Sequence, residues 1–200
     1  MNFRYTSGFG FDFTRKDPNI YLICTEDGYI HRCSKSYKER YLDTYSGHTG
    51  PVYQVRCNPF DSDIFISASA DWTCKIWNIK NEKCLFSLKN LDLMDEVCDV
   101  QWNPFCSTSF ASVCKDGRLE LWNLAKKNFD PIYCYKAKNQ VSKSCLIYSK
   151  SDPILMTGNI NGQIDVFRFF GYENSFVDRE IERKNLYKTL DLNNTQKNLN

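Results

Sequence analysis

Three residues in one short stretch of this chain have the types that a serine hydrolase uses. His48, Ser69 and Asp71 could form a triad in which the histidine takes the serine proton and the carboxylate orients the imidazole. Such a nucleophile needs an exposed, strained turn and an oxyanion hole, whereas Ser69 lies inside a strand-like run, Phe65–Ala70. The chain also has no Gly-x-Ser-x-Gly elbow, P-loop or zincin motif. We therefore predict no catalytic residue and interpret the three side chains as a structural network.

The stretch that holds these residues belongs to a repeat that runs along the chain. A turn residue and, six positions later, an aromatic residue or cysteine recur at spacings of 44, 45 and 45 residues. The four pairs are Asp27 and Cys33, Asp71 and Trp77, Asp116 and Trp122, and Asn161 and Phe167. In three units glycine follows the turn residue, and Asp-Gly or Asn-Gly between apolar runs predicts a two-residue hairpin turn. A period near 45 is typical of four-stranded propeller blades.

The second unit carries the fullest set of signals. Gly47-His48 opens it, a serine-rich strand and a turn at Asp71 follow, and Lys75-Ile76-Trp77-Asn78 closes it, which is the signature of a WD40 propeller blade. We therefore predict an all-β fold, a partial WD40 β-propeller of about four blades over residues 1–172. The expected units span about 8–46, 47–90, 91–137 and 138–172. Because such propellers usually close a ring of seven blades, four units leave blade faces open, and we expect the isolated chain to associate or aggregate.

The polar residues of the second unit have a structural role in WD40 blades that match fully. There such residues form a buried chain from His48 to Asp71, with Ser69 and the Trp77 N–H joined to it, so that each donor satisfies an acceptor. Ser67 is the alternative serine, because it shares the strand face of Ser69. Asp116 and Trp122 are the corresponding residues of the third unit. Cys33 in the first unit, and Asn161 with Phe167 in the fourth, weaken the expectation of such a network in the outer two units.

Trp72 stands where the other three units have glycine. A large aromatic side chain in a tight turn is expected to be at least partly exposed. It could be an anchor for a partner protein, or it could fold over its own blade. The sequence leaves both readings open.

Composition restricts the other functions that this chain could have. A hydrophobic content of 42% can bury a core, and a net charge of +2 gives no electrostatic case for nucleic acid or membrane. A basic and aromatic run, His31–Tyr41, is interpreted as a solvated connection rather than a nucleic-acid site. No run of 18 apolar residues occurs, and the N-terminus has no apolar segment typical of a secretory signal.

The ten cysteines do not indicate a metal site. None lies in a Cys-x-x-Cys arrangement, and only His31 and His48 could add imidazole ligands. Most fall at strand-like positions, so we interpret them as small buried side chains in a reducing cytosol. We expect no metal and no cofactor.

Residues 173–200 differ from the repeats, with mixed charges and an asparagine-rich end. Ser175 followed by Asp178 could cap a short helix through Glu180–Tyr187. We predict a polar tail with this short helix, followed by disorder.

Two segments resemble the WD40-repeat dynein intermediate chains. One is Cys33-Ser34-Lys35-Ser36-Tyr37 with Leu42-Asp43-Thr44-Tyr45, and the other runs from Phe65 to Trp77 and includes an Asp-Trp-Thr turn typical of that family. Asn103-Pro104-Phe105 through Asp116-Gly117 continues the resemblance, which covers about residues 8 to 170. It is strongest to intermediate chain 1 of the axonemal outer arm, of which this would be the C-terminal part, without the long N-terminal region and earlier blades of family members.

The resemblance implies a non-catalytic scaffold that docks on the dynein heavy-chain tail and supports motor assembly for ciliary or flagellar motility. It implies the heavy chain, a second intermediate chain and light chains as partners, an indirect association with microtubules, and a place in the cytoplasm, the cytoskeleton and the axoneme. The alternative is a generic WD40 adaptor of another multiprotein complex.

Overall fold

The computed structural model describes residues 5–37, 39–90, 94–126, 130–137, 140–169 and 178–197, without the side chains of 192–197. This part of the chain contains fifteen strands and one helix. The strands of the first half are β1 Gly8–Phe13, β2 Ile20–Thr25, β3 Ile30–Ser34, β4 Asp43–Tyr45, β5 Val52–Cys57, β6 Ile64–Ser69, β7 Cys74–Asn78 and β8 Asn81–Leu88. The others are β9 Val97–Trp102, β10 Ser109–Cys114, β11 Arg118–Asn123, β12 Tyr133–Lys136, β13 Lys143–Tyr148, β14 Ile154–Asn159 and β15 Ile164–Arg168, followed by helix α1 Arg179–Lys197.

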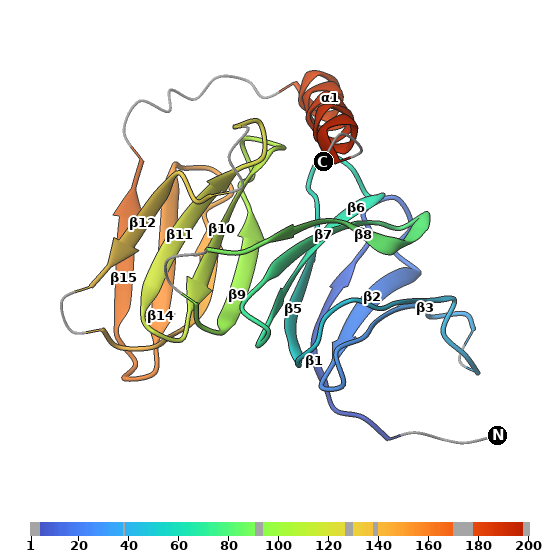
Figure 1. Cartoon of the computed structure of the whole chain (residues 1–200), viewed down its shortest axis with the longest axis horizontal. Coiled ribbons are helices and arrows are strands. Elements are labelled where there is room, and N and C mark those ends of the chain that lie inside the picture. Colours follow the sequence, from blue (N-terminus) through green and yellow to red (C-terminus); the bar gives the residue numbers. More distant parts are fainter. Residues whose placement is uncertain are drawn as a thin grey trace.

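The strands form four antiparallel sheets in chain order, which we call blades one to four. Blades one to three have four strands each, ordered β1-β2-β3-β4, β5-β6-β7-β8 and β9-β10-β11-β12. In the described residues blade four has three, β13-β14-β15. The predicted all-β propeller of about four blades is therefore confirmed (Figure 1).

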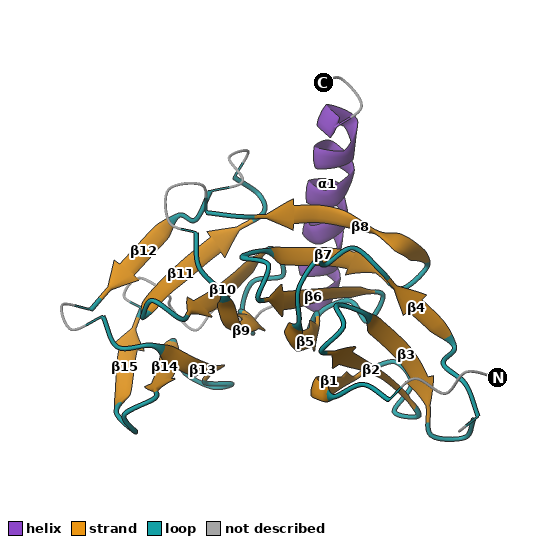
Figure 2. Cartoon of the chain, turned by 60° about the horizontal axis from the view of Figure 1, so that its bottom comes forward, coloured by secondary structure: helices purple, strands orange, loops and turns teal. Residues whose placement is uncertain are grey.

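The blades are arranged as an arc. Figure 2 shows β1, β5, β9 and β13 on its concave side and β4, β8 and β12 on its convex side. Backbone amides and side chains join neighbouring inner strands: the Cys57 N–H donates to Asp12 at 2.8 Å, and the Leu146 N–H donates to Asp99 at 2.9 Å. The Trp102 indole N–H donates to the Arg56 carbonyl at 3.1 Å. These contacts fix the blades relative to one another at the axis of the arc.

The ends of the strands define two opposite faces of the arc. We call the side of the β2–β3, β6–β7, β10–β11 and β14–β15 turns the hairpin face. The inner strands begin on this side and end on the opposite face, since neighbouring strands run antiparallel. The sites described below lie on one face or the other.

The hydrophobic core lies between neighbouring blades, so the central strands are buried on both sides. All six residues of β6 and of β10 are buried. One cluster joins blades one and two around Trp77, a second joins blades two and three around Trp122, and a third joins blades three and four around Leu155. Sheets buried on both faces explain why these strands are rich in β-branched and aromatic side chains.

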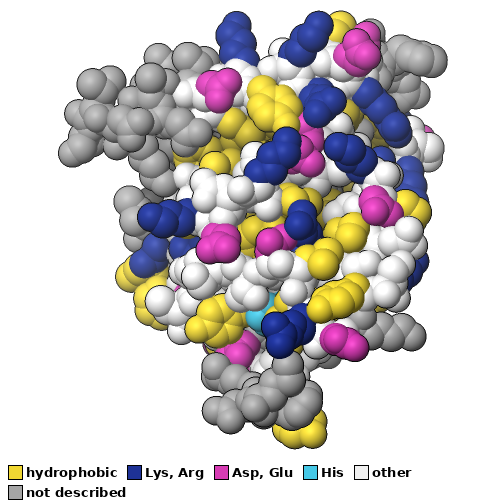
Figure 3. Space-filling model, turned by 90° about the vertical axis from the view of Figure 1, so that its right-hand side faces the viewer, with side chains coloured by type: hydrophobic (Ala, Val, Ile, Leu, Met, Phe, Trp, Pro, Cys, Tyr) yellow, Lys and Arg dark blue, Asp and Glu magenta, His cyan; other side chains and the backbone are white. Residues whose placement is uncertain are grey.

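The two ends of the arc carry exposed apolar side chains, because no further blade packs on them in the described residues. On β15, Ile164 and Val166 are 70% and 63% exposed, and on β1, Phe9 and Phe11 are 50% and 59% exposed. Figure 3 shows hydrophobic side chains among lysines and arginines at the first-blade end. The expected association of the isolated chain remains a prediction that this surface supports.

Helix α1 is longer than the sequence indicated and is part of the folded body. It extends over Arg179–Lys197 rather than ending near Tyr187. Asp178 caps it, accepting the Glu180 N–H at 2.9 Å, while the expected cap Ser175 and residues 198–200 lie outside the described residues. Leu186 and Leu190 are buried in the cluster between blades two and three. Among the described residues, no helix is both long and apolar enough to span a membrane.

Candidate interaction site

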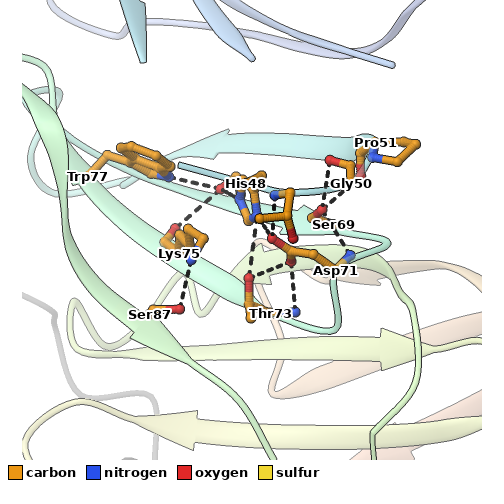
Figure 4. A network of polar contacts seen from close by, with 11 residues as sticks. His48, Gly50, Pro51, Ser69, Asp71, Thr73, Lys75, Trp77 and Ser87 are labelled. Atoms are coloured by element: carbon orange, nitrogen blue, oxygen red, sulfur yellow. Dashed lines mark hydrogen bonds and ion pairs between the residues drawn. The ribbon is translucent and has the colours of Figure 1, made fainter. Parts of the chain in front are cut away.

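The second-blade turn is organised by the carboxylate of Asp71, which follows β6. One oxygen accepts the Thr73 hydroxyl at 2.6 Å and the Thr73 N–H at 3.1 Å. The other accepts from His48 Nδ1 at 2.8 Å and from the Thr49 N–H at 3.1 Å (Figure 4). The carboxylate thereby joins the turn to the segment that precedes β5.

His48 continues the network into the blade. Its Nε2 lies 2.7 Å from the Ser67 hydroxyl, which also accepts the Trp77 indole N–H at 2.9 Å. With the proton of a neutral His48 on Nδ1, the Ser67 hydroxyl donates to Nε2. Each polar group of this network then has a hydrogen-bond partner. His48, Asp71 and Trp77 therefore lie together as the sequence suggested.

Burial sets the protonation of this pair. The His48 side chain is fully buried, and burial lowers the pKa of His48, although Asp71 acts in the opposite direction. Burial alone would raise the pKa of Asp71, but hydrogen bonds from His48, Thr73 and Thr49 outweigh it and hold that pKa well below its ordinary value. A neutral imidazole beside an ionised carboxylate follows.

Ser69 requires a correction, because Ser67 is the serine that contacts His48. The Ser69 hydroxyl donates to the Pro51 carbonyl at 2.8 Å and accepts the Asp71 N–H at 3.1 Å. Both serines lie on one strand face, but Ser69 is two residues nearer the turn and meets the backbone there instead of the imidazole. Ser69 thereby joins the turn at Asp71 to the segment that precedes β5.

Ser67, His48 and Asp71 have the contacts of a catalytic triad but not its access. Ser67 is fully buried, and its oxygen already receives the Trp77 N–H. A nucleophile must reach its substrate and be free to attack. The geometry therefore favours a structural network.

The third blade keeps the indole–serine contact and replaces the histidine by an ion pair. The Trp122 N–H donates to Ser112 at 2.9 Å, and the Ser112 hydroxyl lies 3.3 Å from Glu120. Arg118 Nε is 3.0 Å from Glu120, and its Nη1 is 3.3 Å from Asp116. Asp116 therefore reaches Trp122 only through this chain of side chains.

The outer blades have other polar contacts. In blade four the buried Lys143 ammonium donates to Thr157 at 2.9 Å and to Asp165 at 2.5 Å. In blade one His31 lies 2.9 Å from the Thr44 hydroxyl and stacks on Tyr41. Neither blade has a tryptophan to donate an indole N–H, as the departures in sequence indicated.

Trp72 adopts a backbone conformation that the other blades assign to glycine. Its φ is +68°, and the corresponding Gly28, Gly117 and Gly162 have φ of +87°, +87° and +78°. A left-handed conformation is costly for a bulky side chain. Trp72 is 43% exposed on the hairpin face, with the Lys89 ammonium 5.2 Å from its ring centre.

Sequence reasoning missed several residues that complete these sites. Thr49 and Thr73 satisfy the Asp71 carboxylate, and Glu120 with Arg118 takes the place of the histidine in blade three. The threonine two residues after the turn Asp is a usable signal, because Asp and Thr side chains commonly bond to groups two residues away.

The comparisons with known proteins agree with this architecture. The family of the WD domain, G-beta repeat, matches residues 39–78. Human dynein axonemal intermediate chain 4 is 42% identical over 164 residues, which is 82% of this chain and 19% of that protein. Dynein intermediate chain 2, ciliary, of Heliocidaris crassispina is 38% identical over 157 residues, 77% of this chain and 22% of that protein. Dynein axonemal intermediate chain 1 of Bos taurus is 42% identical over 85 residues, 42% of this chain and 12% of that protein.

The expected relation is thus confirmed: the chain carries a WD40 repeat and is homologous to axonemal dynein intermediate chains. It spans about a fifth of the length of the first relatives it matches.

Proposed function

We propose that this homologue of the axonemal dynein intermediate chains is a non-catalytic scaffold subunit of an axonemal dynein, in the cytoskeleton of a cilium or flagellum. The proposal includes an outer-arm complex, docking of the blades on the dynein heavy-chain tail, and a second intermediate chain and light chains as further partners. The homology over 82% of the chain carries this proposal. The closed polar network of blade two supports the non-catalytic part, because its serine is fully buried.

Within this proposal, Trp72 is the anchor for the heavy chain. A tryptophan held at φ +68° and 43% exposed occupies a place where glycine would be unstrained. Strained backbone conformations of this kind are concentrated at functional sites. Exposed tryptophans are also enriched among residues that dominate binding energy.

Replacing Trp72 by glycine separates binding from folding. Trp72→Gly removes the left-handed strain, so we expect an unchanged or higher melting temperature. It also removes the anchor, so heavy-chain binding should weaken by more than about 1 kcal/mol. Thermal melts measure the melting temperature, and titration with the heavy-chain tail measures the binding free energy. A lower melting temperature with unchanged binding would show that the indole only packs on its own blade.

Co-isolation tests the assignment as a whole. Tagged protein recovered from ciliated cells is expected to bring down axonemal dynein heavy chain. Recovery of another complex without heavy chain would favour the alternative, a generic WD40 adaptor.

A further inference from the structure

A cavity of about 240 Å³ opens on the opposite face, where the four inner strands end. Every blade contributes to its wall, from the ends of β1, β5, β9 and β13. Aromatic side chains line part of it, namely Phe13, Trp102 and Tyr148. The cavity lies at the axis of the arc, away from Trp72 and the hairpin face.

The charges of this cavity are strongly unbalanced. Among the described residues, its wall contains three cations, Arg15, Arg56 and Lys150, and one carboxylate, Asp12. The three cations come from three different blades. Within the described ranges no ion pair joins any of them to a carboxylate.

The nearby carboxylates are engaged by backbone amides instead. Asp12 accepts the Phe13 N–H at 3.0 Å and the Cys57 N–H at 2.8 Å. Asp99, which lies within electrostatic range of Arg56, accepts the N–H groups of Val100 and Leu146 at 2.8 and 2.9 Å. These carboxylates hold neighbouring inner strands together through backbone amides and form no ion pair with the three cations within the described residues.

One nitrogen of the Arg56 guanidinium lacks an acceptor in the part of the chain that the structure describes. Its Nε atom is buried and has no hydrogen-bond partner among the described residues. A buried donor without a partner is costly, and such groups in folded proteins are usually satisfied. Because the Nε atom itself has no open surface, an anion in the cavity would pair with the charge of Arg56 and not with this atom.

We propose that this cavity binds a phosphate monoester. Such a group carries about −1.5 to −2 charges at pH 7 and three acceptor oxygens, which complements the excess of positive charge that three blades present at the cavity wall. Guanidinium groups suit phosphate oxygens in geometry, and a lysine adds a compact charge. The phosphate could belong to a small molecule or to a phosphorylated side chain of a partner protein.

Calorimetric titration of the full 200-residue chain at fixed ionic strength tests this site. The probes are inorganic phosphate, phenyl phosphate, a phosphoserine peptide, and the same peptide with serine or aspartate. Arg15→Gln and Lys150→Gln remove exposed cations of the wall and should each weaken binding at least tenfold. Lys126→Gln, an equal charge change at an exposed turn outside the cavity, should change it less than twofold.

Each result has a defined meaning. Arg15-dependent binding of phenyl phosphate as tight as that of the phosphopeptide supports a small-molecule source, and binding of the phosphopeptide alone supports a protein source. The proposal fails if no phosphate probe binds, if the aspartate peptide binds as tightly as the phosphopeptide, or if Lys126→Gln weakens binding as much as the cavity variants.

Discussion

Replacing Asp71 by alanine removes the centre of the blade-two network. His48 then loses its acceptor at 2.8 Å and keeps a longer contact of 3.4 Å between Nδ1 and the Thr73 hydroxyl. The His48 side chain is fully buried, and an unsatisfied buried donor costs about 1–3 kcal/mol. Thr49 is exposed, so its backbone N–H can donate to water instead of to Asp71.

We therefore expect Asp71→Ala to lower the free energy of unfolding by about 2–3 kcal/mol. For a folded body of this size, that corresponds to a fall in melting temperature of about 5–10 °C. Thermal and urea unfolding of the purified protein measure both quantities. Asp71→Asn keeps an acceptor and should lose less.

Asp116→Ala is the matched control. Asp116 occupies the same turn position in blade three, where its carboxylate accepts the Arg118 N–H at 3.3 Å and pairs with the Arg118 and Lys136 side chains at 3.3 and 3.6 Å. Arg118 keeps Glu120 as a partner, so the loss should stay below about 1 kcal/mol. Equal losses for Asp71→Ala and Asp116→Ala, or none for either, would refute the reasoning about the network.

Three further results are expected. The free energy of unfolding should fall as pH drops below about 6.5, because burial keeps the folded pKa of His48 low while the unfolded imidazole takes up a proton; urea titrations from pH 8 to 5 should show less of this loss in His48→Gln. Leu186→Ala should cost about 2–4 kcal/mol, since Leu186 is fully buried between blades two and three, whereas Ile181→Ala at a 56% exposed site should change unfolding by less than about 0.5 kcal/mol; equal costs would contradict the packing of α1. Alkylation of the native protein should label the exposed Cys145 and Cys134 before the buried Cys24, whose pKa burial raises to about 11, and peptide mass spectrometry that finds Cys24 labelled first would contradict this.

The blades could be predicted because their signals are local. A turn residue with positive φ, as at Gly117, depends on its own backbone, and the spacing of such turns fixes the repeat. The polar and apolar alternation at 118–122 likewise predicts β11. It does not reveal that Arg118 and Glu120 are both buried, because that depends on the blade packed against them.

The parts that escaped prediction depend on contacts between distant segments. Ser67 and Ser69 are equivalent in strand pattern, and only the approach of His48 selects Ser67. Helix α1 has weak amphipathic spacing, and its length reflects contacts such as that of Glu182 with Ser107, 75 residues away. The cavity on the opposite face likewise arises only where the ends of four strands meet.

Cross-linking of intact axonemal dynein that contains this chain tests the central claim most directly. Lys89 lies over Trp72, and Lys115 precedes the third-blade turn, so both belong to the hairpin face. The account predicts lysine cross-links from these two residues to the dynein heavy chain, found by mass spectrometry. Heavy-chain cross-links confined to Lys150 on the opposite face, or none at all, would contradict it.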